Sequence, residues 1–484
     1  MAEAVASRIS LRPFALGTLA YALTVALLAA SSPSLGDDWM PALFSAGAVI
    51  SVAIWSNVHW ADRASRYVSP GAVILLMCAV NRAFYVADYL LRGSRLEGWP
   101  FFSSAPDVAL FKGEVITVLG TLLTVWIWLR FGGLRLTGSE GWGALRAHSG
   151  LLLVLYALAA GSKGISARRP EFADSLGQLL PSLEAVGLVT VAILPSLWVQ
   201  SKHLRVAACL ALSAPYLLSA SSSGMKEEIL LALIPLAFVA WTQYRTKTAR
   251  AALAGTGIIV VALLASYVGF YRDEVWQRKQ TASTANVAAQ FLQKTEESGT
   301  VRTLSEGLTS FISRSNASYH RGWAVSIADE QGYEPALVFG PLIYVFVPRL
   351  LWPEKPPIKQ GWEFSGLVFG DQFIAWSGSS TAAGFYASLY LGWGWPAVVI
   401  GAALAAVLLG MTFRLAARMG GHLAGALYAF AMVPFAVRLD DTWTVGVLSG
   451  PLISLVYVLA IVAVARLASQ LVLRRRSTPE GVAG

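Results

Sequence analysis

The stretch WPAVVIGAALAAVLLGMTF (395–413) is a run of 19 residues without a charged side chain. A helix of about 20 apolar residues crosses the hydrocarbon core of a bilayer, so this run predicts a transmembrane helix. Eleven similar runs recur along the chain. The twelve predicted spans are 13–31, 40–58, 68–91, 109–130, 148–161, 176–199, 205–220, 228–243, 250–270, 395–413, 420–437 and 446–466. The sequence therefore predicts an all-α integral membrane protein.

The composition of the whole chain agrees with this class. Of the 484 residues, 56% are hydrophobic and 13% are charged, whereas soluble domains carry about 25% charged residues. The formal net charge is +9, which on its own could indicate nucleic acid or anionic lipid as a partner. In a membrane protein, cytoplasmic loops rich in Lys and Arg are the first explanation to test.

The distribution of charge predicts the orientation. If the N-terminus is cytoplasmic, the inner segments carry 18 Lys or Arg and only four acidic residues. Every short inner loop then has at least two basic residues, which is the positive-inside pattern. We expect a multi-pass membrane protein with both termini in the cytoplasm. The loop charge accounts for the net charge, so no nucleic acid is expected as a partner.

Residues 272–394 do not read as simple spans and predict one large loop outside the cytoplasm, between helices in 1–271 and in 395–484. The stretch PALVFGPLIYVFVPRLLWP (335–353) is apolar but broken by Pro341, Pro348 and Pro353, which cannot continue a helix. We expect short amphipathic or re-entrant helices here. A loop of this length in a compact protein is usually functional.

Basic residues also occur in the predicted outer segments, where the positive-inside rule does not favour them. An anionic ligand would explain these residues, because guanidinium groups match phosphate oxygens. Long loops are largely exempt from the charge rule, which is the competing explanation. The residues are Lys163, Arg168, Arg169, Lys226, Arg272, Arg314, Arg321, Arg349, Lys355, Lys359 and Arg438.

Three features single out particular residues. His320 precedes Arg321, which suggests a general base beside an anion clamp, although a surface histidine is the alternative. The turn SASSSGMKEEIL (219–230) could offer Lys226 and helix N–H groups to a phosphate, or its serines could cap the helix. Arg82 lies within a predicted span, six residues before Asp88, and an internal ion pair is expected.

No motif for a bound cofactor occurs. Cys78 and Cys209 both lie in apolar runs, and their spacing indicates neither a disulfide nor a metal site. Gly-rich nucleotide loops and HExxH are absent from the sequence. We therefore expect no metal, no nucleotide and no other cofactor.

Two stretches stand out near the end of the predicted outer loop and just after it: PRLLWPEKP (348–356) and SSTAAGFYASLYLGWGWPAVVIGAALAAVLLG (379–410). Together they resemble the oligosaccharide repeat-unit polymerases, the Wzy-type O-antigen polymerase family. The resemblance is clearest over 310–410 and elsewhere extends only to layout. It implies a glycosyltransferase at the outer face of the bacterial inner membrane, which moves a growing glycan from polyprenyl diphosphate onto a lipid-linked repeat unit. A flippase and a chain-length regulator are implied as partners.

The resemblance also implies roles for the basic residues. Arg321, followed by Gly332 after ten residues, fits a loop pattern of that family, and Lys226 stands near an expected arginine. Arg321 and His320 are the catalytic candidates, with His320 as the base. The candidates for binding diphosphate or glycan are Lys226, Arg314, Arg349, Lys355 and Arg438. Secondary base candidates are Glu227, Glu363 and Asp371.

Two alternatives stay open at this point. An O-antigen ligase-like enzyme would use the same donor but transfer the glycan to a lipid core or a protein. A lipid or polysaccharide transporter would show repeats and broken helices in mid-membrane, and no internal repeat is visible in the sequence.

Overall fold

The computed structural model describes residues 12–35, 39–61, 70–92, 106–131, 148–168, 179–223, 226–244, 246–272, 274, 284–315, 318–347, 352, 354–370, 381–437, 439 and 442–477. These residues form helices and contain no β-strand, so the predicted all-α class is confirmed for them.

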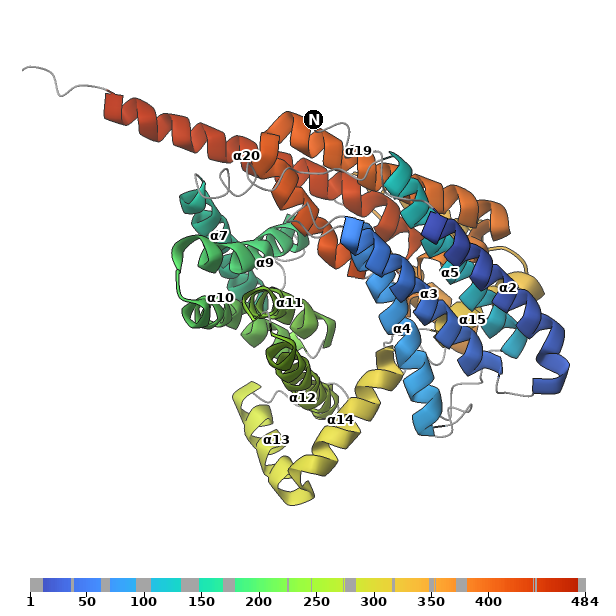
Figure 1. Ribbon diagram of the computed structural model, residues 1–484. Helices are drawn as coiled ribbons and strands as arrows, with labels where there is room; N and C mark the ends of the chain where they lie inside the picture. Colours follow the sequence, from blue (N-terminus) through green and yellow to red (C-terminus); the bar gives the residue numbers. More distant parts are fainter. Residues whose placement is uncertain are drawn as a thin grey trace, which may run out of the picture.

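The helices fall into two groups in Figure 1, with α19 and α20 running across both. The first group comprises α2 (Arg12–Leu35), α3 (Trp39–Ala61), α4 (Pro70–Arg92), α5 (Asp107–Phe131) and α15 (Ser318–Glu330). The second comprises α7 (Ser149–Arg168), α9 (Leu179–Trp198), α10 (Lys202–Ser223), α11 (Lys226–Gln243) and α12 (Lys247–Tyr271). Helix α19 contains Phe385–Val437 and α20 contains Thr444–Ser477.

Six described helices are long and apolar enough to cross a membrane. Their ranges are Val73–Leu91, Asp107–Arg130, Lys202–Ala220, Lys247–Tyr271, Phe385–Gly421 and Thr444–Val464. Each coincides with one of the predicted spans. The sequence predicted twelve, and this number is not supported: Ala15–Leu28, Met40–Trp55, Ser149–Ile165 and Val186–Trp198 are apolar but shorter than 18 residues.

Helix α19 is interrupted at two glycines. Gly394 has φ +67° and Gly421 has φ +71°, and Trp393 is also non-helical. Positive φ is accessible to glycine at little cost, so these positions allow the chain to change direction. The two interruptions lie at the predicted starts of the spans 395–413 and 420–437.

The described part of 272–394 is folded into short helices. They are α13 (Thr284–Ser298), α14 (Thr300–Ser315), α15, α16 (Pro335–Phe339), the 3₁₀ turn η4 (Gly340–Ile343) and α17 (Gln360–Phe369). Within 335–353, the described residues thus form a short α-helix and a 3₁₀ turn that contains Pro341.

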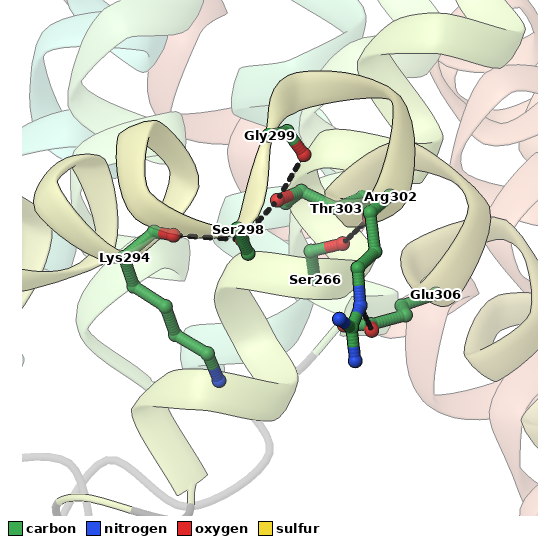
Figure 2. Close-up of polar contacts among 7 residues, drawn as sticks. All are labelled: Ser266, Lys294, Ser298, Gly299, Arg302, Thr303 and Glu306. Carbon is green, nitrogen blue, oxygen red and sulfur yellow. Dashed lines mark hydrogen bonds and ion pairs between the residues drawn. The ribbon is translucent and has the colours of Figure 1, made fainter.

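Helix α14 connects the two groups of helices (Figure 1). At its start, Ser266 Oγ of α12 donates to the Thr303 carbonyl over 2.6 Å, as Figure 2 shows. Gly307 packs directly on Ala262 and Ser266, leaving no room there for a Cβ. Further along, Phe311 meets Phe84 of α4 edge to face, with 5.3 Å between ring centroids.

The turn before α14 is closed by local hydrogen bonds. Gly299, at φ +85°, separates α13 from α14. Ser298 Oγ donates to the Lys294 carbonyl over 2.7 Å and lies 3.2 Å from the Thr303 hydroxyl oxygen (Figure 2). These contacts fix the angle between the two helices.

Candidate functional site

Two charged side chains are enclosed between α4 and α5. Arg82 Nε lies 2.6 Å from Glu114 Oε1, and both side chains are fully buried. Arg82 Nη1 also donates to the Cys78 carbonyl over 2.7 Å. Gly47 of α3 makes room for the pair, because a Cβ at this position would lie 3.1 Å from Arg82 Cδ. Charges buried in a membrane protein are costly, which makes this pair a candidate for function.

Arg321 is buried beside the same helices. It lies in α15, its exposed fraction is 1%, and its Nη2 donates to Ser318 Oγ over 3.3 Å. Gly113 of α5 allows this close packing, since a Cβ there would lie 3.2 Å from the Arg321 carbonyl carbon. Sequence analysis placed Arg321 in an outer loop. The structure places it in a helix that buries eight of its 13 residues.

The three charges share one environment around Tyr21 of α2. The Tyr21 side chain is fully buried, and its hydroxyl lies within electrostatic reach of Glu114, Arg82 and Arg321. We call Tyr21, Arg82, Glu114 and Arg321 the buried charge cluster. Their helices, α2, α4, α5 and α15, lie side by side in Figure 1.

A second polar group lies at the edge of the α5–α15 contact. Lys112 Nζ is 2.8 Å from both carboxylate oxygens of Asp329, and the Tyr390 hydroxyl donates to Asp329 Oδ1 over 2.8 Å. Lys112 Nζ also lies 4.6 Å from the Tyr390 ring centroid. We call Lys112, Asp329 and Tyr390 the rim triad. It joins α5, α15 and α19 and leaves Lys112 and Asp329 about one-third exposed.

The turn after α15 is fastened to the first interruption of α19. The Glu334 amide donates to the Leu391 carbonyl over 2.8 Å. Tyr333 packs against Gly394, where a Cβ would lie 2.7 Å from its hydroxyl oxygen. The Tyr333 and Tyr390 rings meet edge to face with centroids 6.4 Å apart. The interruption in α19 therefore receives the end of α15 and positions Asp329.

His320, the predicted base, is half-buried next to Arg321. Its ring lies 5.6 Å from the Trp323 ring, centroid to centroid, and Trp323 packs edge to face on Phe369 of α17. The imidazole is thus held by aromatic packing and keeps access to the surface. Arg321 and His320 come from one helix, so the structure keeps them together, but it encloses only Arg321.

Other predicted residues lie elsewhere. Lys355 is buried and its Nζ donates to the carbonyls of Val345 and Val347 over 3.1 and 2.9 Å, which fastens the segment after η4. Glu363 is exposed on α17. Lys226 and Glu227 begin α11 and Arg314 ends α14, but their side chains fall outside the described ones. Arg349, Asp371 and Arg438 lie outside the described residues.

Sequence reasoning missed Glu114, Lys112, Asp329 and Tyr390. A signal for the first two was present in DVALFKGEVITVLG (107–120), where two charges interrupt an apolar run. A charge within a span marks a functional candidate, and this rule singles out Lys112 and Glu114 as well as Arg82. Asp88 was the expected partner of Arg82 because it is near in sequence. The structure pairs Arg82 with Glu114 on the neighbouring helix, where packing brings the carboxylate closer.

Neither cysteine is in a disulfide: Cys78 and Cys209 are both buried thiols. Within the described ranges, no group of three His, Cys, Asp or Glu side chains is arranged to hold a metal ion.

Comparison with known proteins gives one match. A family model described as a domain of unknown function (DUF8712) matches residues 148–432. No curated protein matches the chain, and no solved structure does. The matched range begins at α7 and ends within α19, so it includes Arg321 and Asp329, whereas Arg82, Lys112 and Glu114 precede it. Because this range covers more than half of the 484 residues, the chain belongs to the DUF8712 family.

Proposed function

We propose that this protein is a membrane glycosyltransferase that polymerises lipid-linked oligosaccharide repeat units. In this proposal the donor is a glycan on polyprenyl diphosphate and the acceptor is a second lipid-linked unit, at the outer face of the bacterial inner membrane. The resemblance of 348–356 and 379–410 to repeat-unit polymerases supports the choice of reaction. The apolar helices support the choice of compartment.

The observation that carries the proposal is the position of Arg321. It belongs to the stretch that resembles the polymerases, and it is held at 1% exposure against α5, next to the Arg82–Glu114 pair. A loop arginine without a function would remain in water, because burying a guanidinium costs several kcal/mol, on the order of the penalty for any buried ion. A fixed cation in a low-dielectric site strongly stabilises charge that develops nearby.

The burial of Arg321 changes the role proposed for it. At 1% exposure the guanidinium is not an open clamp in this conformation. We assign it the role of a fixed positive charge beneath the α15 surface that carries His320. The lipid diphosphate would then approach this surface from the bilayer, and the charge of Arg321 would act on it at short range.

The chemical step in this proposal balances without a cofactor. The acceptor hydroxyl oxygen attacks the anomeric carbon of the donor sugar, and the bond from that carbon to the diphosphate oxygen breaks. The polyprenyl diphosphate leaves with the bonding electrons, and the positive charge of Arg321 stabilises the developing negative charge. His320 accepts the proton from the acceptor hydroxyl.

The orientation is part of the same proposal. With both termini in the cytoplasm, the N-terminal end of α5, α15 and the α13–α14 hairpin lie on the outer side. This assignment rests on the loop charges, which place 18 basic residues in inner segments. It brings His320 and the rim triad to the side where lipid-linked repeat units are polymerised.

The glycan profile of a strain lacking the gene tests the proposed function. Complementation with the wild-type protein should restore a ladder of many repeats, whereas Arg321→Gln and His320→Gln should give single repeats at equal membrane abundance. Arg302→Gln is the matched control, because Arg302 is exposed on α14, where it pairs with Glu306. Normal polymer in the deletion strain would remove the proposal. Polymer that forms but is not attached to its final carrier would identify a ligase instead.

A further inference from the structure

The turns α9–α10 and α11–α12 meet at one end of the second group of helices. His203 Nδ1 lies 2.9 Å from the Tyr244 hydroxyl, and Arg205 Nη1 donates to Gln243 Oε1 over 3.1 Å. Lys202 Nζ lies 5.9 Å from the Tyr244 ring centroid. These contacts join two turns that are about 40 residues apart in sequence, so they form one surface.

Two arginines hold this surface in shape. Arg205 Nε donates to the Val199 carbonyl at the end of α9, and Arg250 Nε donates to the Tyr244 carbonyl over 3.2 Å. Each guanidinium therefore closes its own turn by binding a carbonyl near the end of a helix. Three basic side chains remain exposed: Lys202 and His203, which contact Tyr244, and Lys247, which lies three residues after it. We call Lys202, His203, Arg205, Lys247 and Arg250 the basic turn surface.

The helices that carry these cations are poor in carboxylates. The sequence contains no Asp or Glu in 185–226 or in 229–272. The neighbouring helices α7, α19 and α20 also lack acidic residues along their whole lengths. Glu184 of α9 lies at the other end of that helix, where it pairs with Lys163 over 3.0 Å. The described residues thus place several cations, and no anion, at this end of α9–α12.

Apolar side chains adjoin the cations. Trp198 is 52% exposed at the end of α9, and Leu204 is 61% exposed in the first turn of α10. Helices α10 and α12 both begin at this surface, and both are long and apolar enough to enter a bilayer. Tryptophan at the start of a span is typical of the membrane–water interface. Helix N-termini add a favourable field for an anion.

We infer that the basic turn surface binds the headgroup of an anionic phospholipid. The cations and the N-termini of α10 and α12 would hold the phosphate, and Trp198 and Leu204 would contact the upper part of the acyl chains. A free phosphate would use the same cations but would not need the exposed apolar residues. This inference is independent of the proposed glycosyl transfer, which uses residues in the other group of helices.

Native mass spectrometry of the full-length protein in detergent tests the inference, with phosphatidylglycerol and phosphatidylcholine of matched acyl chains as probes. The variant is Lys202→Gln/Lys247→Gln, and the control is Lys294→Gln/Lys359→Gln. All four lysines are exposed, and each pair lowers the net charge by the same amount. Phosphatidylglycerol should bind the wild-type protein more tightly. At about a five- to sixfold loss per cation, the variant with two cations removed should bind it roughly 30-fold more weakly.

The control should bind phosphatidylglycerol like the wild-type protein. Equal binding of both lipids, or an equal loss in the control, would overturn the inference. Inorganic phosphate that occupies the surface alone and displaces the lipid would reassign the site to a free anion. Lys247→Glu is a second variant, because it removes one exposed lysine without altering the Lys202–Tyr244 contact. It should weaken phosphatidylglycerol binding on its own.

Discussion

At the scale of single residues, the Arg82–Glu114 pair decides how the first group of helices must pack. Both side chains are fully buried, and Gly47 gives them space. An ion pair in a low-dielectric interior contributes little net stability over apolar residues of the same size. In the proposed reaction, the pair would instead contribute charge close to Arg321.

Glu114→Gln should strongly destabilise the protein. Arg82 would stay buried without the charge of its partner, and breaking such a pair costs roughly 3–5 kcal/mol. Thermal unfolding in detergent measures the change. Glu306→Gln is the control, because it breaks the exposed Arg302–Glu306 pair, which contributes about 0.5 kcal/mol or less.

The double variant Arg82→Met/Glu114→Leu separates folding from function. It should recover most of the stability, since apolar residues of similar volume often replace a buried pair without cost. Polymer should nevertheless be lost if the charge of the cluster serves the reaction. A melting temperature of Glu114→Gln equal to that of Glu306→Gln would contradict the role of the pair.

At the scale of elements, α14 and α15 fasten the segment between α12 and α19 onto the bundle. Helix α14 joins α12 to α4 through Ser266–Thr303 and Phe84–Phe311. Helix α15 lies on α5 at Gly113. The α12–α14 contact depends on Gly307 and the α5–α15 contact depends on Gly113, because the backbones approach closely at these two positions. The position of the candidate site thus depends on glycines that let the helices pack closely.

Gly307→Ala should separate α14 from α12. The added Cβ would overlap Ala262 and Ser266, and overpacking of this kind costs about 1–3 kcal/mol. Gly161→Ala of α7 is the control: nothing lies within 4 Å of its Cβ position, so it should be neutral or stabilising. Gly307→Ala should therefore lower the melting temperature, whereas Gly161→Ala should leave it unchanged or raise it. Equal melting temperatures would show that the α12–α14 contact is not close.

Some of these elements were predictable and others were not. Hydropathy correctly located 109–130 and 395–413, because the hydrophobic effect acts on contiguous apolar runs. The spans predicted at 13–31 and 148–161 are not supported, because the described apolar parts of these helices, Ala15–Leu28 and Ser149–Ile165, are shorter than 18 residues. The burial of α15 could not be predicted, because SYHRGWAVSIADE (318–330) is only weakly apolar. Its burial follows from the flat surface that Gly113 offers on a distant helix.

Across the whole molecule, the basic turn surface and the rim triad lie near different ends of the helices. The basic turn surface and the end of α5 at Arg130 carry cations, and the rim triad lies near the opposite end of α5. In the proposed orientation, the basic turn surface would face the cytoplasm. The α13–α14 hairpin and α15 would lie outside, on the side proposed for the reaction.

Cysteine labelling checks this orientation. The native Cys78 and Cys209 are buried, so an impermeant maleimide should label the wild-type protein weakly. Ser305→Cys on the exposed face of α14 should react in intact cells. Thr248→Cys, exposed in the first turn of α12, should react only after permeabilisation. The reverse pattern would invert the topology and place the proposed site in the cytoplasm.

The most direct test of the central claim is the reaction of the purified protein with polyprenyl-diphosphate-linked repeat units. The wild-type protein should produce a ladder of glycans and release one polyprenyl diphosphate for each new bond. Arg321→Gln should lower this rate by about 100-fold or more, because it removes a fixed positive charge from beside the developing negative charge. Arg302→Gln should leave the rate unchanged. No elongation by the folded wild-type protein, or an equal rate for both variants, would contradict the account.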